Sequence, residues 1–368
     1  MKILFVVNSM DGHNGYDRYA RSLGSALRVN GHEVSTVESV LGNHGARLHA
    51  PTSYCTRRSP FFLDVPVLQK VISTYRPEVI HFVIEPYIAL LPFVRTYGAR
   101  CVMTAHGTYA YPPALISGFG RRIHRAIFRR AFVRLDRIIT VSHYTRELLI
   151  ARARQDDTKI SEEKIMVIPN GIESAPYTSA SHHNKVFTVL TVAPMKARKG
   201  ILETVHALAE LHKRDIPFAW RIVGRVEKSA YAGAVRAEIE QLGLKEAVTF
   251  VGSVDDGALR REYQRADVFV MLPIEHGLKV EGFGLVYLEA NACGTPVVGA
   301  LHSGAEEAII DGINGFLVNP HDTRAVADAV ERVKRGGISL DGMMQWVCQH
   351  DIRTVAQRVE AVYAEGTI

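Results

Sequence analysis

Residues 281–298 decide the predicted fold, and they read Glu281-Gly282-Phe283-Gly284-Leu285-Val286-Tyr287-Leu288-Glu289-Ala290-Asn291-Ala292-Cys293-Gly294-Thr295-Pro296-Val297-Val298. Two glycines precede apolar and small residues at helical spacing, which predicts a loop leading into a helix that ends at Gly294, before a strand. A helix N-terminus presents unpaired N–H groups and favours an anion such as a phosphate. Glu281 precedes the helix and Glu289 lies in its second turn, so the two carboxylates can accept from different hydroxyls of one ligand.

A capped helix with two solvated glutamates is the simpler interpretation of this spacing. The whole string, glycines included, resembles the signature of the retaining family-4 glycosyltransferases of the GT-B fold. The resemblance implies that the donor is a nucleotide-diphosphate sugar and that no separate cofactor is needed. It also implies that Glu289 holds the nucleotide ribose, while the donor sugar is held by Glu281 and by the loop residues Phe283, Gly284 and Leu285.

Composition and length fit a two-domain globular protein. The chain has 368 residues, 47% hydrophobic and 22% charged, and no apolar run approaches the ~18 residues of a membrane helix. A formal charge of +6 suits an anionic ligand, either a nucleotide diphosphate or a membrane surface. No nucleic-acid-binding motif is present, so nucleic acid is not an expected partner. The four scattered cysteines lack metal-like spacing and favour a reducing, cytoplasmic location.

Strands and helices alternate in both halves of the sequence, which predicts two doubly wound, Rossmann-like parallel sheets. Together with the resemblance, this gives an α/β fold of the GT-B type. Residues 1–173 with 350–368 are expected to form an acceptor-binding domain, and 186–349 a nucleotide-sugar-binding domain, joined by a linker at 174–185. The helical stripe at 352–363 is expected to cross back onto the first domain. Ligands of such sheets bind at the carboxyl ends of strands, so a cleft between the domains is the expected site.

Two residues of the first half are candidates for that site. Gly15 stands where a loop after the first strand enters a helix, and it matches a glycine that contacts the donor in the resembled family. His106 follows the strand predicted at 100–105. A buried structural histidine is the alternative for His106, but the position matches the family's strand-end histidine, which contacts the donor sugar. We therefore count His106 with Glu281 and Lys199 as a candidate catalytic residue.

Lys199 lies in a turn that precedes a predicted helix at 201–213, and it is the candidate cation for the departing diphosphate. The family's motif has an arginine five residues before this lysine, where this chain has Pro194. Arg198 is a candidate replacement, as is Lys196. No Asp-x-Asp motif occurs, so a metal-independent reaction is expected. By resemblance, a hexosyl-type sugar is transferred with retention to a hydroxyl of a saccharide, lipid-linked or small-molecule acceptor.

Some alternatives stay open at this point. A GT-B sugar-nucleotide epimerase would share the architecture but lack the 281–289 signature, and a non-catalytic sugar-nucleotide-binding protein would lack His106. Residues 119–135 predict a strongly basic amphipathic helix. Such a helix has either an ordinary solvated basic face or a peripheral contact with an anionic membrane, on the inner face of the membrane.

Overall fold

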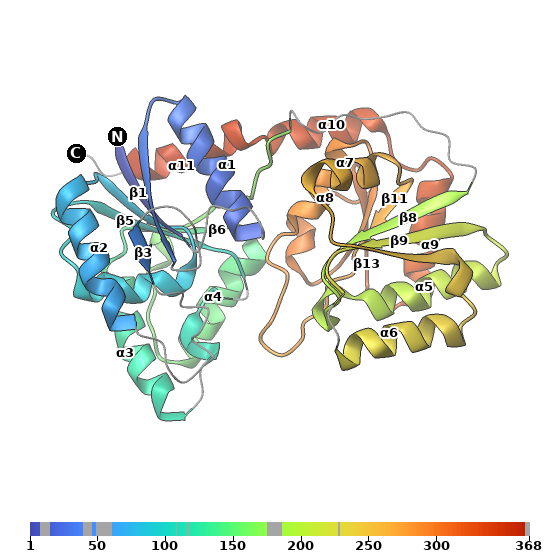
Figure 1. Ribbon diagram of the computed structural model, residues 1–368, viewed down its shortest axis with the longest axis horizontal. Helices are drawn as coiled ribbons and strands as arrows, with labels where there is room; N and C mark the ends of the chain where they lie inside the picture. The colour runs from blue at the N-terminus through green and yellow to red at the C-terminus, as the bar shows by residue number, and fades with distance from the viewer. Residues whose placement is uncertain are drawn as a thin grey trace. The chain divides into compact units, whose positions relative to one another are not determined.

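The computed structural model describes residues 1–7, 15–39, 46–48, 61–107, 109–115, 118–174, 186–226 and 229–364. The chain forms two compact units, the first comprising Met1–Gly171 and Ile352–Ile368, the second Ile172–Asp351. The sequence places the corresponding boundaries after residue 173 and before residue 350, which is a prediction of its own. Most of the expected linker, residues 175–185, lies outside the described residues. Each unit is built on a parallel sheet, which confirms the predicted α/β class (Figure 1).

The sheet of the first unit has seven described strands in the order β3-β2-β1-β4-β5-β6-β7, and every neighbouring pair is parallel. The order reverses at β1, which lies beside both β2 and β4. This is the doubly wound arrangement. The strands are β1 (Lys2–Val7), β2 (Glu33–Ser39), β3 (Ala46–Leu48), β4 (Val79–Phe82), β5 (Arg100–Ala105), β6 (Arg137–Thr140) and β7 (Ile165–Val167).

Helices cover both faces of this sheet because both sets of alternating strand side chains are apolar. Along β1, Ile3 and Phe5 pack with α1 (Gly15–Val29) and α11 (Ile352–Ala364). Leu4 and Val6 pack on the opposite face, in a separate core. The segments of that core are α2 (Phe61–Tyr75), the 3-10 segment η2 (Glu85–Phe93), α3 (Gly118–Arg134) and α4 (His143–Gln155). The shorter 3-10 turns are η3 (Pro112–Leu115) and η4 (Glu162–Lys164).

The second unit repeats the plan with a parallel sheet in the order β10-β9-β8-β11-β12-β13. Its strands are β8 (Phe187–Val192), β9 (Phe218–Val223), β10 (Val248–Gly252), β11 (Val268–Val270), β12 (Val297–Ala300) and β13 (Gly315–Val318). Its helices are α5 (Ile201–Lys213), α6 (Ala230–Gln241), α7 (Asp256–Gln264), α8 (Leu285–Ala292), α9 (Thr323–Lys334) and α10 (Leu340–Gln349). The 3-10 turns η5 (Ala197–Lys199), η6 (Lys245–Ala247) and η7 (Gly304–Glu307) complete it.

Strand order determines which loops of the second unit meet. β8, β11 and β12 are consecutive neighbours and run in the same direction. Their carboxyl ends therefore lie at one edge of the sheet, where open α/β sheets bind ligands. The loop after β8 carries Lys199, the loop after β11 carries residues 281–284, and the loop after β12 carries Gly304. The fold thus gathers three loops at this edge.

Candidate functional site

Three charged side chains meet at this edge of the second unit. Lys199 Nζ donates to Glu281 Oε2, and Arg198 Nη1 donates to the same oxygen over 3.1 Å. All three side chains are largely buried. Burial alone would raise the pKa of Glu281, but Lys199 and Arg198 outweigh it and hold that pKa below its ordinary value. Glu281 is therefore ionised and paired with two cations of the neighbouring loop.

The turn that follows Lys199 requires a glycine. Gly200 has φ of +64°, and a Cβ added there would lie 1.6 Å from the carbonyl oxygen of Leu272, just after β11. The same two loops are joined by a hydrogen bond of 3.1 Å from the N–H of Ile274 to the carbonyl oxygen of Arg198. A close backbone approach of this kind is possible only without a side chain. It holds Arg198 and Lys199 against the segment that leads to Glu281.

The loop 281–284 is held by a second glycine that the sequence did not single out. A Cβ on Gly304 would lie 2.1 Å from the carbonyl carbon of Gly282, and the N–H of Gly304 donates to the carbonyl oxygen of Glu281 over 3.0 Å. Gly284 precedes α8 with φ of +87°, a conformation suited to glycine. The loop after β12 thus fixes the backbone beside the Glu281 side chain.

Glu289 lies on α8, only 2% exposed. Its Oε2 accepts a hydrogen bond of 2.8 Å from the hydroxyl of Tyr263 on α7. Tyr263 is held in turn through its carbonyl oxygen, which accepts from Thr295 Oγ1 over 2.7 Å. The structure therefore places Glu281 and Glu289 in one unit, each with a defined partner, and Tyr263 is a contact that sequence spacing could not reveal.

The other residues of this unit that are predicted to contact the donor are Phe283, Gly284 and Leu285, in the loop and at the start of α8. Phe283 is 2% exposed, and its ring centroid lies 6.2 Å from that of His350, so its side chain packs inward. Leu285 is the first residue of α8. The donor contacts implied for Phe283, Gly284 and Leu285 stay predictions, and for Phe283 the inward-packed ring leaves the backbone as the group for such a contact.

Pro194 occupies a turn where two backbones cross closely. Gly224 after β9 has φ of +136°, and a Cβ there would lie 2.2 Å from the carbonyl oxygen of Ala193. The N–H of Met195 donates to the carbonyl oxygen of Arg225 over 3.1 Å. Pro194 supplies no cation here, and the arginine beside Glu281 is Arg198 instead.

In the first unit, His106 follows β5 and is 7% exposed. Its Nε2 lies 2.9 Å from the carbonyl oxygen of Val83, and a carbonyl can only accept, so Nε2 carries the hydrogen. Burial lowers the pKa of His106 to about 4, which keeps the ring neutral. Nδ1 is then an unprotonated acceptor. The rings of Tyr16 and Tyr19 on α1 each lie 5.0 Å away in an edge-on arrangement.

Gly15 is the first residue of α1 and is exposed. A Cβ added there would meet no atom within 4 Å among the described residues, so packing of the unit does not require a glycine. The next residue, Tyr16, is in ring contact with His106. The structure thus brings the start of α1 and the end of β5 together, and the donor contacts of Gly15 and His106 stay predictions.

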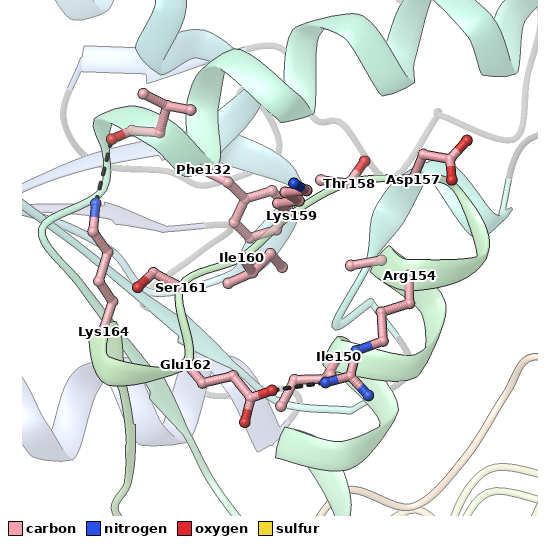
Figure 2. A pocket seen from close by; sticks show the side chains of 12 residues that line it. Phe132, Ile150, Arg154, Asp157, Thr158, Lys159, Ile160, Ser161, Glu162 and Lys164 are labelled. Carbon is pink, nitrogen blue, oxygen red and sulfur yellow. Dashed lines mark hydrogen bonds and ion pairs between the residues drawn. The ribbon is translucent and has the colours of Figure 1, made fainter.

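A separate cavity of about 690 Å³ lies in the first unit, between α4 and the chain from residue 157 to 164 (Figure 2). Its apolar lining includes Phe132, Ile150 and Ile160. Figure 2 shows Arg154 pointing to Glu162 across the rim, an ion pair of 2.8 Å. No residue predicted for the site is among those that line this cavity.

Two family profiles match the sequence in succession. Residues 13–175 match the profile described as Glycosyltransferase Family 4, and residues 178–344 match Glycosyl transferases group 1. A relative from Mycolicibacterium smegmatis, a GDP-mannose-dependent alpha-(1-6)-phosphatidylinositol monomannoside mannosyltransferase, is 29% identical over 301 residues, which are 76% of this chain and 75% of the relative.

The fold is that of known glycosyltransferase structures. A glycosyltransferase from Rickettsia africae superposes with a TM-score of 0.74 at 18% identity, covering 99% of this chain and 98% of that one. The Anabaena protein HepE, solved with UDP and glucose, gives a TM-score of 0.72 at 19% identity, with 98% of each chain covered. Fold and sequence together define an enzyme that transfers glycosyl groups, with the GT-B architecture. The chain belongs to the family-4 glycosyltransferases.

Proposed function

We propose that this enzyme moves a hexosyl-type sugar from a nucleotide-diphosphate sugar to a hydroxyl of a saccharide, lipid-linked or small-molecule acceptor, with retention and without a metal. The observation that carries the proposal is the cluster of Lys199, Arg198 and Glu281 at the edge of the sheet, with Glu289 on the helix that follows. It supplies cations for a diphosphate and carboxylates for hydroxyls. The name of the mycolicibacterial relative supports a sugar-nucleotide donor.

Each residue has a part in this reaction. Lys199, with Arg198 beside it, binds the diphosphate and stabilises the charge that develops as the bond from sugar C1 to phosphate breaks. Glu281 accepts hydrogen bonds from sugar hydroxyls, and Glu289 accepts from the ribose. His106 contacts the donor sugar through Nδ1, while Gly15 leaves room beside it.

The balance of atoms requires no protein nucleophile. The acceptor hydroxyl oxygen attacks C1 on the face that the phosphate leaves, and a new glycosidic bond forms there. The phosphate oxygen departs with the bonding electron pair and takes the proton of the acceptor hydroxyl. Retention follows because bond formation and bond breaking occur on one face. The products are the glycosylated acceptor and a nucleoside diphosphate.

The experiment that tests this proposal is a screen of the purified enzyme. Sugar nucleotides carrying UDP, GDP or ADP are incubated with pooled hydroxyl acceptors, with and without EDTA, and products are identified by mass spectrometry and by the anomeric proton coupling. We expect a nucleoside diphosphate and a retained glycoside at the same rate in both conditions. An inverted product, or complete loss with EDTA that Mg²⁺ or Mn²⁺ restores, would contradict the mechanism proposed.

We also propose, as a second property, peripheral contact of α3 with an anionic membrane. Among the described residues, no helix is long and apolar enough to span a bilayer. On α3, Arg122 and Arg130 are exposed, and Val133 is 74% exposed on the same helix. Arginines interspersed with exposed aliphatic side chains suit an interface.

Some arginines of α3, however, bind acceptor groups within the first unit. Arg121 pairs with Asp156 at 2.8 Å, and Arg129 Nη2 donates to the carbonyl oxygens of Asp156 and Asp157 at the end of α4. Arg134 donates to the carbonyl oxygen of Leu91 in η2 and, over 3.0 Å, to that of Val94 just after η2. These arginines stabilise the fold, so a membrane surface would be met by Arg122 and Arg130.

A further inference from the structure

A buried carboxyl group lies next to His106, and the proposed reaction does not use it. Glu85 is the first residue of η2, three residues after β4, and its side chain is completely inaccessible to solvent. Its neighbours in the chain and in the first turn, Ile84, Tyr87 and Ile88, belong to the apolar core of the unit. Placing an acid in such surroundings is unfavourable unless hydrogen bonds compensate.

The carboxyl group of Glu85 is hydrogen-bonded by backbone N–H groups, those of Glu85 itself, His106 and Gly107, and the last two follow β5 at the candidate site. Oε1 accepts from the backbone N–H of His106. In the part of the chain that the structure describes, Oε2 has no hydrogen-bond partner. β5 ends at Ala105, so the N–H of His106 lies beyond the strand. The carboxylate supplies an acceptor there in place of a strand neighbour.

His106 is thereby held at two points by one short segment. Its backbone N–H is bound by Glu85, and its ring Nε2–H by the carbonyl oxygen of Val83. Ile84 between them is extended, with φ of −135° and ψ of 136°. The two contacts come from different groups of this extended segment, the backbone carbonyl of Val83 and the side chain of Glu85. The two contacts together fix both the position of the backbone and the orientation of the ring.

We propose that Glu85 is the positioning residue of His106, holding its backbone so that the ring stays bonded to Val83 and Nδ1 stays available to accept from the donor sugar. This inference rests on the proposed function, in which His106 contacts the sugar. Glu85 touches no substrate in this account and acts only through His106. The competing explanation is that Glu85 merely anchors the start of η2.

The test compares Glu85→Ala and Glu85→Gln with a matched control, Asp136→Ala. Asp136 Oδ2 also accepts a backbone N–H of β5, that of Cys101 over 2.7 Å, but at the opposite end of the strand. Three readouts are taken for each variant: the melting temperature, the ¹⁵N chemical shifts that report the His106 tautomer, and kcat and KM for the donor. If Glu85→Ala does not fold, Glu85→Asp replaces it, since its shorter side chain withdraws the carboxylate from the N–H.

The expected result is specific to the site. Glu85→Ala should shift the His106 ring signals toward a mixture of tautomers and lower kcat/KM about 10-fold to 100-fold. Glu85→Gln, whose amide oxygen still accepts the N–H, should restore the signals and most of the activity. Asp136→Ala should lower only the melting temperature. Unchanged His106 signals in Glu85→Ala, or an equal shift in Asp136→Ala, would overturn the inference. A shifted His106 in an enzyme that transfers no sugar would instead refute the proposed function.

Discussion

Lys199 Nζ donates a hydrogen bond to Glu281 Oε2 across the edge of the second sheet, joining residues that are 82 positions apart. In the proposed reaction these two groups bind different parts of the donor, the diphosphate and the sugar. Without the donor, each neutralises the other, because an unpaired buried charge is costly. The proposed function therefore predicts an exchange of partners when the donor binds. The phosphate takes the place of the carboxylate at Lys199, and the sugar hydroxyls take the place of the ammonium at Glu281.

Replacing Lys199 with Met should weaken the binding of a nucleoside diphosphate. A hydrogen bond to a charged group contributes ~1.5–3 kcal/mol, so the dissociation constant should rise about 10-fold to 150-fold. Isothermal titration of the free nucleotide measures this directly. The matched control is Lys213→Met on α5, whose side chain is 70% exposed and whose ammonium lies 4.0 Å from Glu210. Equal affinities in Lys199→Met and wild type would remove Lys199 from the diphosphate site.

Replacing Glu289 with Gln should reduce the recognition of ribose. The wild type should bind a nucleoside diphosphate more tightly than its 2′,3′-dideoxy analogue, by about 10-fold or more for a charged acceptor. The ratio of the dissociation constants of the dideoxy analogue and the nucleoside diphosphate should fall toward one in Glu289→Gln. Tyr263→Phe, which removes the hydroxyl bonded to Glu289, should give an intermediate ratio. A dideoxy penalty that is unchanged in Glu289→Gln would mean that this carboxylate does not contact the ribose.

Glu85 should make the stability of the first unit depend on pH. Burial raises the pKa of Glu85 from 4.5 to about 7. The folded state therefore binds the proton more tightly than the unfolded state. The tighter binding of this proton contributes on the order of 3 kcal/mol to the free energy of unfolding. The contribution is fully present below about pH 4.5 and is lost as the pH rises through 7. His106 stays neutral in this window with its pKa near 4, and Arg152 nearby stays charged and favours the ionised form.

Urea denaturation of wild type and Glu85→Gln at several pH values tests this directly, because the amide does not titrate. The difference in unfolding free energy between the two proteins should grow in favour of the glutamine variant from pH 4.5 to 7. A difference that is flat with pH would show that the buried carboxyl group keeps an ordinary pKa.

The sheets of both units were predictable from the sequence because strands buried on both faces read as continuous apolar runs. The runs at 218–223 and 248–252 are the strands β9 and β10, and the helical pattern at 201–213 is α5. The basic pattern at 119–135 is α3, displaced by one residue. The position of each strand and helix follows from the periodicity of apolar residues within that segment alone.

The contacts that build the site were not predictable in the same way. The pairs Lys199 with Glu281, Tyr263 with Glu289, and Glu85 with His106 join separate segments of the chain, which meet only after the strands have assembled. No local pattern marks Gly304 as the residue on which the loop 281–284 rests. Its role comes from a close backbone approach between the segment after β12 and the loop before α8.

Contact of α3 with a membrane should depend on its outward arginines. Binding to anionic liposomes should weaken with salt, and Arg122→Glu with Arg130→Glu should release the enzyme, since each arginine near the surface contributes about 1 kcal/mol. The melting temperature of this double variant should be unchanged. Arg129→Glu should instead lower the melting temperature, because Arg129 binds the end of α4. Absent or salt-independent binding would favour a solvated basic face and a soluble acceptor.

The most direct test of the donor site is the affinity of Glu281→Gln for a sugar nucleotide and for the matching free nucleoside diphosphate, measured by titration beside the wild type. Glu281 is expected to contact only the sugar, so the variant should lose transfer and the ~1.5–3 kcal/mol that the sugar adds to binding. Its affinity for the free diphosphate should be equal to or tighter than that of the wild type, because Lys199 and Arg198 are released from the carboxylate. An equal loss of affinity for both ligands would contradict the assignment of Glu281 to the sugar and of Lys199 to the diphosphate.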